Sequence, residues 1–255
     1  MKNQQKNKVL PHSFNHAATT YDQYNQMQLT IFDWLMQSIS HLTPATILDI
    51  GCGTGLLTNR LHNYFNCHHT LGIDQSKAMI EIAKKNNVST GLTFQQANAM
   101  DYKLDFTPDL IFSNATLQWL PDINLFFYNL SKQISNQTQF IASIFLPSTF
   151  QELQRGLEQV LGYKEPIAAA QFCTENQLKT IITQHLPQSK FTTFKQHQPF
   201  SDVKSLLTTL KHNGTTSRKP AIMWTAQKLH QLDEWFKAEY QAVRVSYEVL
   251  GVRFD

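Results

Sequence analysis

The chain lacks the features that mark several specialised classes of protein. Its three cysteines, Cys52, Cys67 and Cys173, are an odd number without CxxC spacing, which predicts neither a disulfide framework nor a structural zinc site. No apolar run approaches the roughly 18 residues of a membrane span, and the first eight residues lack the apolar stretch of a signal peptide. We therefore expect a soluble, cytoplasmic protein with no membrane partner.

The sequence also lacks a large excess of positive or negative charge. The 22 Lys and Arg residues against 19 Asp and Glu residues leave a net charge of +3, too small a bias to predict nucleic-acid binding without a clustered patch. The ten histidines include no HExxH pair, and the neighbours His68 and His69 would point to opposite faces of a strand. No metal site is expected.

The composition that remains is that of an ordinary globular protein, with 42% hydrophobic residues in a chain of 255. This length suits one large domain, or a catalytic domain with a sizeable insertion. The sequence shows no long exposed apolar seam, so we expect a monomer.

Short apolar runs alternate with helical patterns between residues 43 and 147. Strands are expected over 46–50, 70–73, 92–95, 108–113 and 140–145, with helices over 56–64, 77–85 and 123–134. Such alternation is typical of βαβ units, so the sequence predicts an α/β fold with a doubly wound, mostly parallel sheet.

The flanking segments complete a division into three parts, 1–42, 43–147 and 148–255. The first part is expected to form one amphipathic helix over 21–42. The third is expected to form a helical lid, with helices over 150–161, 174–185, 201–213 and 226–240. Thr174, Ser201 and Thr225 are the predicted caps. Strands over 190–200 and 243–250 are expected to pair at an antiparallel edge of the sheet.

A glycine-rich loop gives the strongest functional signal. Gly51, Gly53 and Gly55 lie between a buried strand and a helix, where missing side chains let a ligand approach the backbone. The free N–H groups of the helix start suit an anionic group. Position 56 is Leu, so the third glycine comes one residue too early for the dinucleotide pattern G-x-G-x-x-G.

With Asp49 directly before it, this loop resembles the motif of the class I S-adenosylmethionine-dependent methyltransferases, which have a Rossmann-like fold. The resemblance implies that Asp49 holds the amino-acid end of the cofactor. It also implies that Asp74, at the end of the next strand, accepts hydrogen bonds from both ribose hydroxyls. The alternative reading of Asp74 is a cap for the helix that begins near Ser76.

Further cofactor contacts follow from the same resemblance. Asn98 stands where the family commonly has an Asp at the adenine, and Asp101 is the alternative acid. Asn114 ends the fourth strand and is expected to contact the methionine part, whereas Leu117 and Trp119 are expected to pack in the core. The expected cofactor-binding residues are His16, Tyr21, Asp49, Gly51, Cys52, Gly53, Gly55, Asp74, Gln75, Asn98, Ala99, Met100 and Asn114.

The flanks narrow the resemblance to one family. Segments 14–28, 145–153, 210–216 and 247–250 are similar, in order and spacing, to the malonyl-acyl carrier protein O-methyltransferases of biotin synthesis. This resemblance implies S-adenosylmethionine as methyl donor and S-adenosylhomocysteine as product. It also implies methyl esterification of the malonyl carboxylate, with acyl carrier protein as partner and coenzyme A as the alternative carrier.

This chemistry needs no general base, because the malonyl carboxylate is already ionised near neutral pH. A cation is expected near it, and the candidates are Arg155, Lys211 and Arg218. Tyr21 is expected to close the pocket, and His16 is either a structural cap or a catalytic group. A basic carboxyl-terminal half is a candidate surface for steering an acidic carrier protein.

Two other functions remain open on the sequence. A trans-aconitate-type small-acid O-methyltransferase would share a fourth-strand segment similar to residues 113–119. A non-catalytic binder would use the same fold as a scaffold, but the presence of Asp49, the glycines and Asp74 argues against it. Nucleic-acid methylation is disfavoured, because the chain has no Asn-Pro-Pro-aromatic run.

Overall fold

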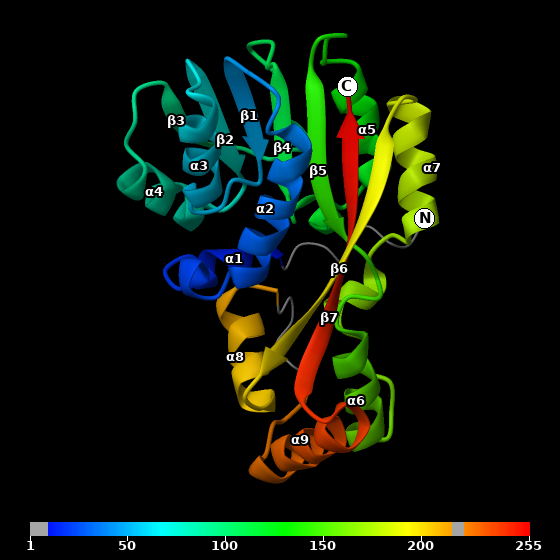
Figure 1. Cartoon of the computed structure of the whole chain (residues 1–255). Coiled ribbons are helices and arrows are strands. Elements are labelled where there is room, and N and C mark those ends of the chain that lie inside the picture. The colour runs from blue at the N-terminus through cyan, green and yellow to red at the C-terminus, as the bar shows by residue number, and fades with distance from the viewer. Residues whose placement is uncertain (1–9, 216–221) are drawn as a thin grey trace.

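The computed structural model describes residues 10–215 and 222–255. A seven-stranded sheet in the order β3-β2-β1-β4-β5-β7-β6 forms its framework (Figure 1). The strands are β1 (Thr46–Ile50), β2 (His69–Asp74), β3 (Leu92–Gln96), β4 (Leu110–Asn114), β5 (Gln139–Phe145), β6 (Lys190–Phe200) and β7 (Val243–Phe254). Strands β1 to β5 pair in parallel, while β7 is antiparallel to both β5 and β6. The predicted doubly wound, Rossmann-like sheet with an antiparallel edge is confirmed.

Helices cover both faces of the parallel part of the sheet, as alternating βα units require. Helices α2 (Gln26–Ile39) and α3 (Leu56–Phe65) bury their apolar residues against β1 and β4 on one face, and α4 (Lys77–Asn86) packs against β3. Helices α5 (Ile123–Ser131) and α7 (Glu175–His185) pack together against the other face. The carboxyl ends of the parallel strands therefore meet at one edge, where the glycine loop lies.

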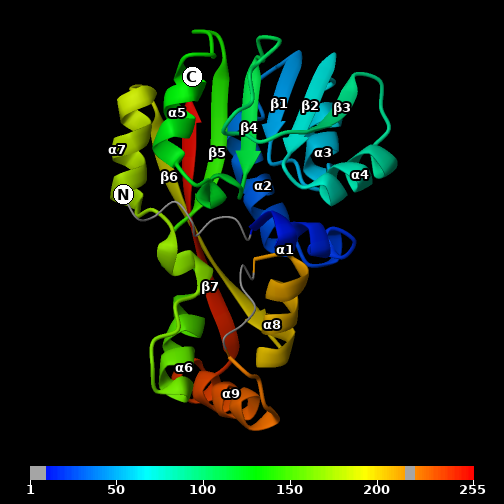
Figure 2. The same cartoon turned by 180° about the vertical axis from the view of Figure 1, so that it is seen from behind.

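A second core forms around the ends of β6 and β7 that extend beyond the parallel strands. Helices α6 (Gln151–Leu161), α8 (Val203–His212) and α9 (Ala226–Tyr240) surround these strand ends, and Figure 2 shows this lower lobe from behind. Leu157, Leu206 and Phe236, one from each helix, pack with Val245 and Tyr247 of β7. The lid predicted for the third part of the chain thus has its own apolar core. The division into three parts stays a prediction.

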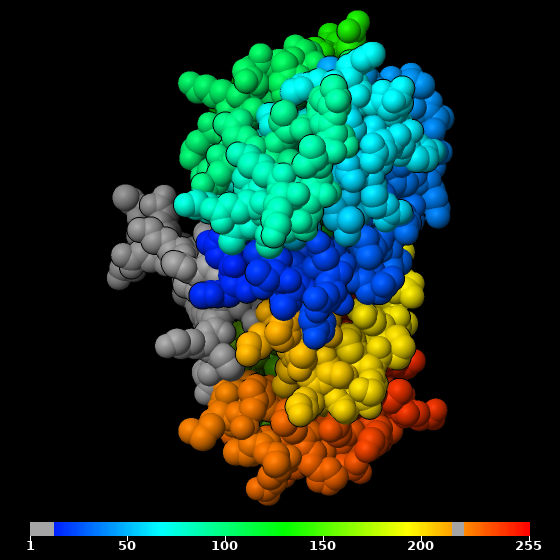
Figure 3. All heavy atoms as spheres, turned by 90° about the vertical axis from the view of Figure 1, so that its left-hand side faces the viewer, coloured from blue at the N-terminus to red at the C-terminus, as the bar shows by residue number. Residues whose placement is uncertain are grey.

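The amino-terminal segment differs from the single helix predicted over 21–42. It forms α1 (Leu10–Ala17), a 3₁₀ turn η1 (Tyr21–Gln23), and only then α2. The polar side chains before α2 bond outside the helix, since Asp22 Oδ1 accepts from Thr54 Oγ1 at 2.7 Å. Such bonds compete with helix formation. Figure 3 shows this segment, in blue, as a band between the upper sheet and the lower lobe.

Local signals located most helix starts correctly. Thr174 and Gln177 form the predicted capping box of α7, and the Thr225 side chain caps α9. The predicted cap Ser201 is wrong by one residue, because Asp202 accepts the backbone N–H of Ser205 at 2.6 Å and caps α8 instead. None of the described helices has the length and apolarity needed to cross a membrane.

Candidate active site

The three loop glycines have different structural roles. Gly51, Gly53 and Gly55 all have positive φ, between 55° and 80°, which other residues rarely adopt. A Cβ on Gly53 would meet only Tyr21 Cε1, at 4.0 Å, so this residue faces open space. A Cβ on Gly55 would lie 2.7 Å from the Phe94 ring. Gly55 thus permits close packing of α3, and it does not line the pockets described below.

Above the loop lies a pocket of about 280 Å³, called here the glycine-loop pocket. It is lined by residues from the ends of β1, β2, β3 and β4 and from the amino-terminal segment. Its walls include Phe14, Tyr21, Gly51, Gly53, Asp74 and Asn98. The pocket is large enough for part of a nucleoside-sized ligand.

Asp74 is held with its carboxylate in this pocket. Oδ2 accepts the backbone N–H of Gly53 at 3.0 Å, and Oδ1 accepts that of Ser76 at 2.8 Å. Burial nevertheless raises the pKa of Asp74, since the two N–H bonds compensate only in part. Helix α4 is capped by Ser76, whose Oγ accepts from Met79 N–H at 3.2 Å, so the alternative reading of Asp74 as the cap is wrong.

At the far end of the glycine-loop pocket the Asn98 amide is fixed in one orientation. Its Oδ1 accepts from Met100 N–H at 3.1 Å, and its Nδ2 donates to Asp101 Oδ2 at 3.0 Å. Asn98 lines the pocket together with Gln75 and Ala99. Asp101 does not line the pocket and contacts it only through its hydrogen bond with Asn98. The Met100 side chain packs into the main core and does not line the pocket.

Tyr21 lies over the glycine loop and lines both this pocket and a smaller one beside it. Burial raises the pKa of its hydroxyl, and the nearby carboxylates Asp74 and Asp22 raise it further. The phenol therefore stays neutral and can donate a hydrogen bond. His16, in contrast, lies exposed at the end of α1 and lines none of the pockets described.

The smaller pocket, of about 30 Å³, is called here the polar pocket. It is lined by Asp49, Cys52, Asn25, Gln28 and Asn114, among others. Asp49 is 3% exposed and accepts one hydrogen bond, from Thr58 Oγ1 at 2.6 Å. Burial raises the pKa of Asp49 to about 7, because that bond offsets little of the lost hydration.

Two other residues predicted to bind the cofactor, Cys52 and Asn114, also line the polar pocket. Burial raises the pKa of the Cys52 thiol well above its usual range, so it stays protonated. Asn114 Nδ2 donates to the backbone carbonyl of Gln28 at 2.9 Å, and its Oδ1 accepts from Ser143 Oγ at 2.7 Å. Asn114 thus joins the end of β4 to α2 at the boundary between the two pockets.

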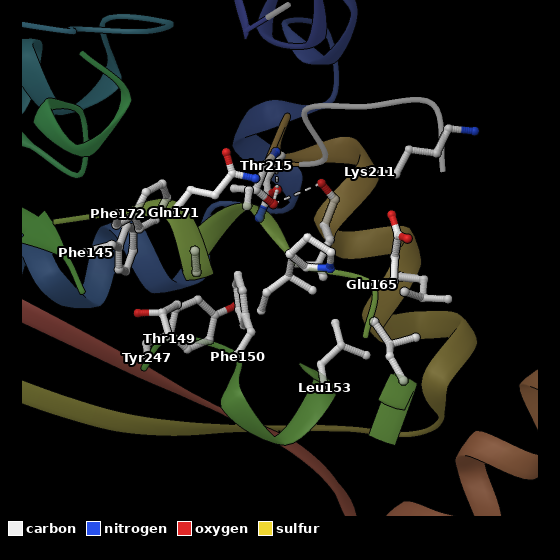
Figure 4. A pocket seen from close by; sticks show the side chains of 18 of the residues that line it. Phe145, Thr149, Phe150, Leu153, Glu165, Gln171, Phe172, Lys211, Thr215 and Tyr247 are labelled. Atoms are coloured by element: carbon white, nitrogen blue, oxygen red, sulfur yellow. Dashed lines mark hydrogen bonds between the residues drawn. The ribbon is translucent and has the colours of Figure 1, made fainter. Parts of the chain in front are cut away.

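A third space, the lid cavity, has a volume of about 540 Å³ and adjoins both pockets. Figure 4 shows its wall of aromatic and aliphatic side chains, which includes Phe145, Phe150, Leu153, Phe172 and Tyr247. Trp119 lines both the lid cavity and the glycine-loop pocket, and Gln28 lines both the lid cavity and the polar pocket. The lid cavity and the two pockets at the glycine loop are therefore neighbours that share single side chains as walls.

The two predicted anion-binding residues that the structure describes, Lys211 and Arg155, are not brought together by the fold. Lys211 lies at the edge of the lid cavity with its amino group directed away from the aromatic wall, and Glu165 lies on the same side (Figure 4). Arg155 is exposed on α6 and does not line the cavity. Arg218 lies outside the described residues. The lid cavity is thus mainly apolar, with cationic charge supplied by Lys211 alone among its described lining residues.

Two parts of the site were missed from the sequence. Trp119 was expected in the core, but it is half-buried and separates the glycine-loop pocket from the lid cavity, whereas Leu117 is fully buried as expected. Asn25 and Gln28 were not expected to bind the cofactor. Gln28 lies in segment 14–28, which carries the family resemblance, and the available signal was the presence of polar residues at the start of an otherwise apolar helix.

The residues present fit S-adenosylmethionine. Asp74 offers a carboxylate for ribose hydroxyls, and Gly53 leaves room above the loop. The polar pocket contains hydrogen-bond acceptors without partners, the side-chain oxygens of Asn25 and Gln28. These acceptors beside Asp49 suit an ammonium group such as that of the methionine part.

Comparison with known proteins gives the class of the chain first. The sequence pattern of the family described as "Methyltransferase domain" matches residues 43–212. The plantazolicin methyltransferase BpumL, solved in complex with SAH, superposes with a TM-score of 0.54 at 16% identity, covering 95% of this chain and 93% of that one. Fold and sequence pattern thus define a class I methyltransferase, and the prediction of S-adenosylmethionine as methyl donor is confirmed.

Full-length relatives narrow the class to a family. The malonyl-[acyl-carrier protein] O-methyltransferase of Priestia megaterium is 30% identical over 95% of this chain and 95% of its own length. That of Bacillus anthracis is 29% identical over 92% and 94%. The chain belongs to the malonyl-[acyl-carrier protein] O-methyltransferase family, which confirms the resemblance found in the sequence.

Proposed function

We propose that this protein transfers the methyl group of S-adenosylmethionine to the free carboxylate of a malonyl group carried by acyl carrier protein. The observation that carries the proposal is the lid cavity, which meets the cofactor pockets at Trp119 and Gln28. Its volume exceeds what a three-carbon acyl group needs, so it has room for part of the arm that carries the group. The names of the full-length relatives support the same acceptor.

Each cofactor-binding residue has a definite task in this proposal. Asp74 receives the ribose hydroxyls, Asn98 and Ala99 border the adenine, and Asp49 receives the ammonium group of the methionine part. Tyr21 covers the loop and excludes water. When bound, the cofactor supplies an electrophilic methyl group on a sulfonium ion, and the protein aligns the attacking oxygen with it.

The apolar lid cavity favours this reaction electrostatically. A carboxylate that attacks a sulfonium ion loses its charge as the bond forms, and so does the sulfonium. Surroundings of low dielectric solvate the two charged reactants less than water does, while the less charged transition state loses little, and they exclude competing water. A cation bound tightly to the attacking oxygen would oppose the reaction by stabilising the charged starting state. At the edge of the cavity, Lys211 guides the acceptor carboxylate inward in this proposal.

Steering by a broad basic face receives little support from the structure. Four lysines of the carboxyl-terminal half have acidic partners, with N–O distances from 2.7 to 3.9 Å. The pairs are Lys164 with Glu158, Lys179 with Glu175, Lys190 with Asp255, and Lys195 with Glu248. Their positive charge is largely offset locally, so we assign carrier recognition to the mouth of the lid cavity.

The direct test compares three acceptors at equal concentration, with the methyl group of S-adenosylmethionine labelled. Label is expected mainly on malonyl-acyl carrier protein, less on malonyl-coenzyme A, and at background on trans-aconitate. Preference for trans-aconitate would replace the proposal with the small-acid function. Transfer to none of the three, with cofactor binding intact, would contradict the proposed acceptor.

A further inference from the structure

Two side-chain oxygens near the start of α2 are buried without a hydrogen-bond partner. They are Oε1 of Gln28 and Oδ1 of Asn25, in residues that are 6% and 2% exposed. Leaving such an atom unpaired destabilises a folded protein, so each needs an explanation. Asn114, beside Gln28, uses both ends of its amide in hydrogen bonds. The unpaired oxygens are therefore not typical of this part of the molecule.

Asn25 and Gln28, the residues that carry these oxygens, both line the polar pocket together with Asp49. All three groups accept hydrogen bonds, and one of them is an acid. A volume of about 30 Å³ matches a small group such as a water molecule or an ammonium ion. A positively charged group with several N–H donors satisfies this set best.

Gln28 differs from Asn25 because it also lines the lid cavity. We propose that the Gln28 side chain binds both reactants, accepting a hydrogen bond from the cofactor's ammonium group through Oε1 and donating one to the acceptor carboxylate through Nε2. This inference rests on the proposed function for the acceptor half only. The part that concerns the cofactor is supported by the lining of the polar pocket and by the unpaired oxygens of Asn25 and Gln28.

An amide suits this double task better than other side chains of similar size. It carries an acceptor and a donor on one planar group, so fixing one end orients the other. A cofactor bound first would hold Oε1 and thereby direct Nε2 toward the lid cavity. Gln28 would then position the carboxylate without neutralising it, as the electrostatics of the reaction require.

Gln28→Glu separates the two halves of the proposal. Glu retains an oxygen for the ammonium group but replaces the N–H donors with a second oxygen. We expect the Kd for S-adenosylmethionine, measured by calorimetry without acceptor, to stay within about 3-fold or to fall. The kcat/KM for malonyl-acyl carrier protein should drop by about 100-fold or more, since two carboxylates would face each other. Gln26→Glu, exposed on the same helix, adds the same charge and should leave both quantities unchanged.

Gln28→Met removes both polar ends at similar volume. The Kd for S-adenosylmethionine should rise about 10- to 100-fold, the loss of one hydrogen bond to a charged group. Without cofactor, the melting temperature of this variant should be equal to or higher than that of the native protein, because an unpaired buried oxygen has been removed.

The outcomes distinguish this inference from the proposed function. A Gln28→Met variant that melts lower without cofactor yet binds it normally would make Gln28 a structural residue and overturn the inference. Normal turnover by Gln28→Glu would overturn its acceptor half. If the native protein methylates none of the malonyl thioesters, the proposed function fails, while calorimetry on Gln28→Met still decides the cofactor half.

Discussion

Asp49 combines a buried carboxyl group with very few compensating contacts. Thr58 donates its one hydrogen bond, and Asp74 is close enough to raise the pKa of Asp49 further. With a pKa of about 7, Asp49 is about half protonated at neutral pH in the free protein, because burial disfavours its charged form. A bound ammonium group would reverse this preference. With the role proposed for it, Asp49 would link cofactor binding to proton release.

This linkage predicts opposite pH effects on folding and on binding. Between pH 4 and 7 the unfolded chain has lost the Asp49 proton, which the folded protein retains until pH passes its pKa of about 7. The free energy of unfolding of the cofactor-free protein should therefore fall as pH rises through this window. Cofactor affinity should increase between pH 6 and 8, with proton uptake by the buffer. Calorimetry in two buffers of different ionisation enthalpy measures this, and Asp49→Asn should abolish the pH dependence.

Asp74 provides a second prediction at the residue scale. Asp74→Asn should raise the Kd for S-adenosylmethionine about 10- to 100-fold, because charge-assisted hydrogen bonds to the ribose are lost. The control is Asp33→Asn, which removes an exposed acid paired with Arg60 and should not change the Kd. Equal cofactor affinity in the Asp74 variant and the native protein would exclude the ribose role.

The sequence indicated Asp49 and Asp74 through the family resemblance, which agrees with the convergence of neighbouring parallel strand ends at one edge of a sheet. It could also have excluded Arg155, which lies two residues from each of the buried Leu153 and Leu157 and hence on the opposite side of α6. The role inferred for Gln28 could not be predicted in this way. It depends on how α2 is placed against the end of β4, which no local pattern fixes.

Helix α6 shows how an element is fitted to the lid. Glu152, 5% exposed, accepts the backbone N–H of Ser246 at 2.8 Å and also the Ser246 hydroxyl. These bonds fasten the start of α6 to β7. One turn later, Gly156 allows close contact with α9, since a Cβ there would lie 2.6 Å from Leu232 and 2.7 Å from Trp235. Leu153 and Leu157 are thereby held in the wall of the lid cavity.

Gly156→Ala tests this packing. In an exposed helix the change would stabilise the protein by up to about 1 kcal/mol. Here we expect destabilisation of about 1–3 kcal/mol, because the added methyl group overfills the contact with α9. Gln159→Ala, exposed on the same helix, is the control. Denaturant unfolding followed by circular dichroism measures both, and a more stable Gly156 variant would contradict the packing argument.

The elements predicted best are those determined by local chemistry. The caps Thr174 and Thr225 precede clear helical patterns, and their helices begin where predicted. The helix predicted over 21–42 is confirmed over 26–39 but begins later than predicted, after a segment in which Asp22 bonds to Thr54, a residue distant in sequence. Local propensity cannot reveal a break caused by such a contact.

At the scale of the whole molecule, the amino-terminal segment joins the cofactor site to the lid. On one side, Asn15 Oδ1 accepts from Ser76 Oγ at 2.7 Å. On the other, Tyr24 stacks on His212 with ring centroids 4.8 Å apart, and Thr20 Oγ1 donates to the His212 carbonyl at 3.2 Å. The residue before His212 lines the lid cavity. Displacing the segment to admit cofactor would therefore also remove a support of the cavity wall.

This arrangement predicts coupling between the two reactants. His212→Ala removes the stacking on Tyr24, and His212 is not one of the residues that line the glycine-loop pocket. We expect the Kd for S-adenosylmethionine to stay within about 3-fold and the KM for malonyl-acyl carrier protein to rise about 5- to 10-fold, the loss of roughly 1 kcal/mol of coupling. His230→Ala, exposed on α9, should change neither. In the native protein, cofactor should slow the hydrogen exchange of backbone amides in both the amino-terminal segment and the end of α8. In His212→Ala it should slow exchange in the amino-terminal segment only. Equal protection of α8 in both proteins would show that the lid closes independently of the segment.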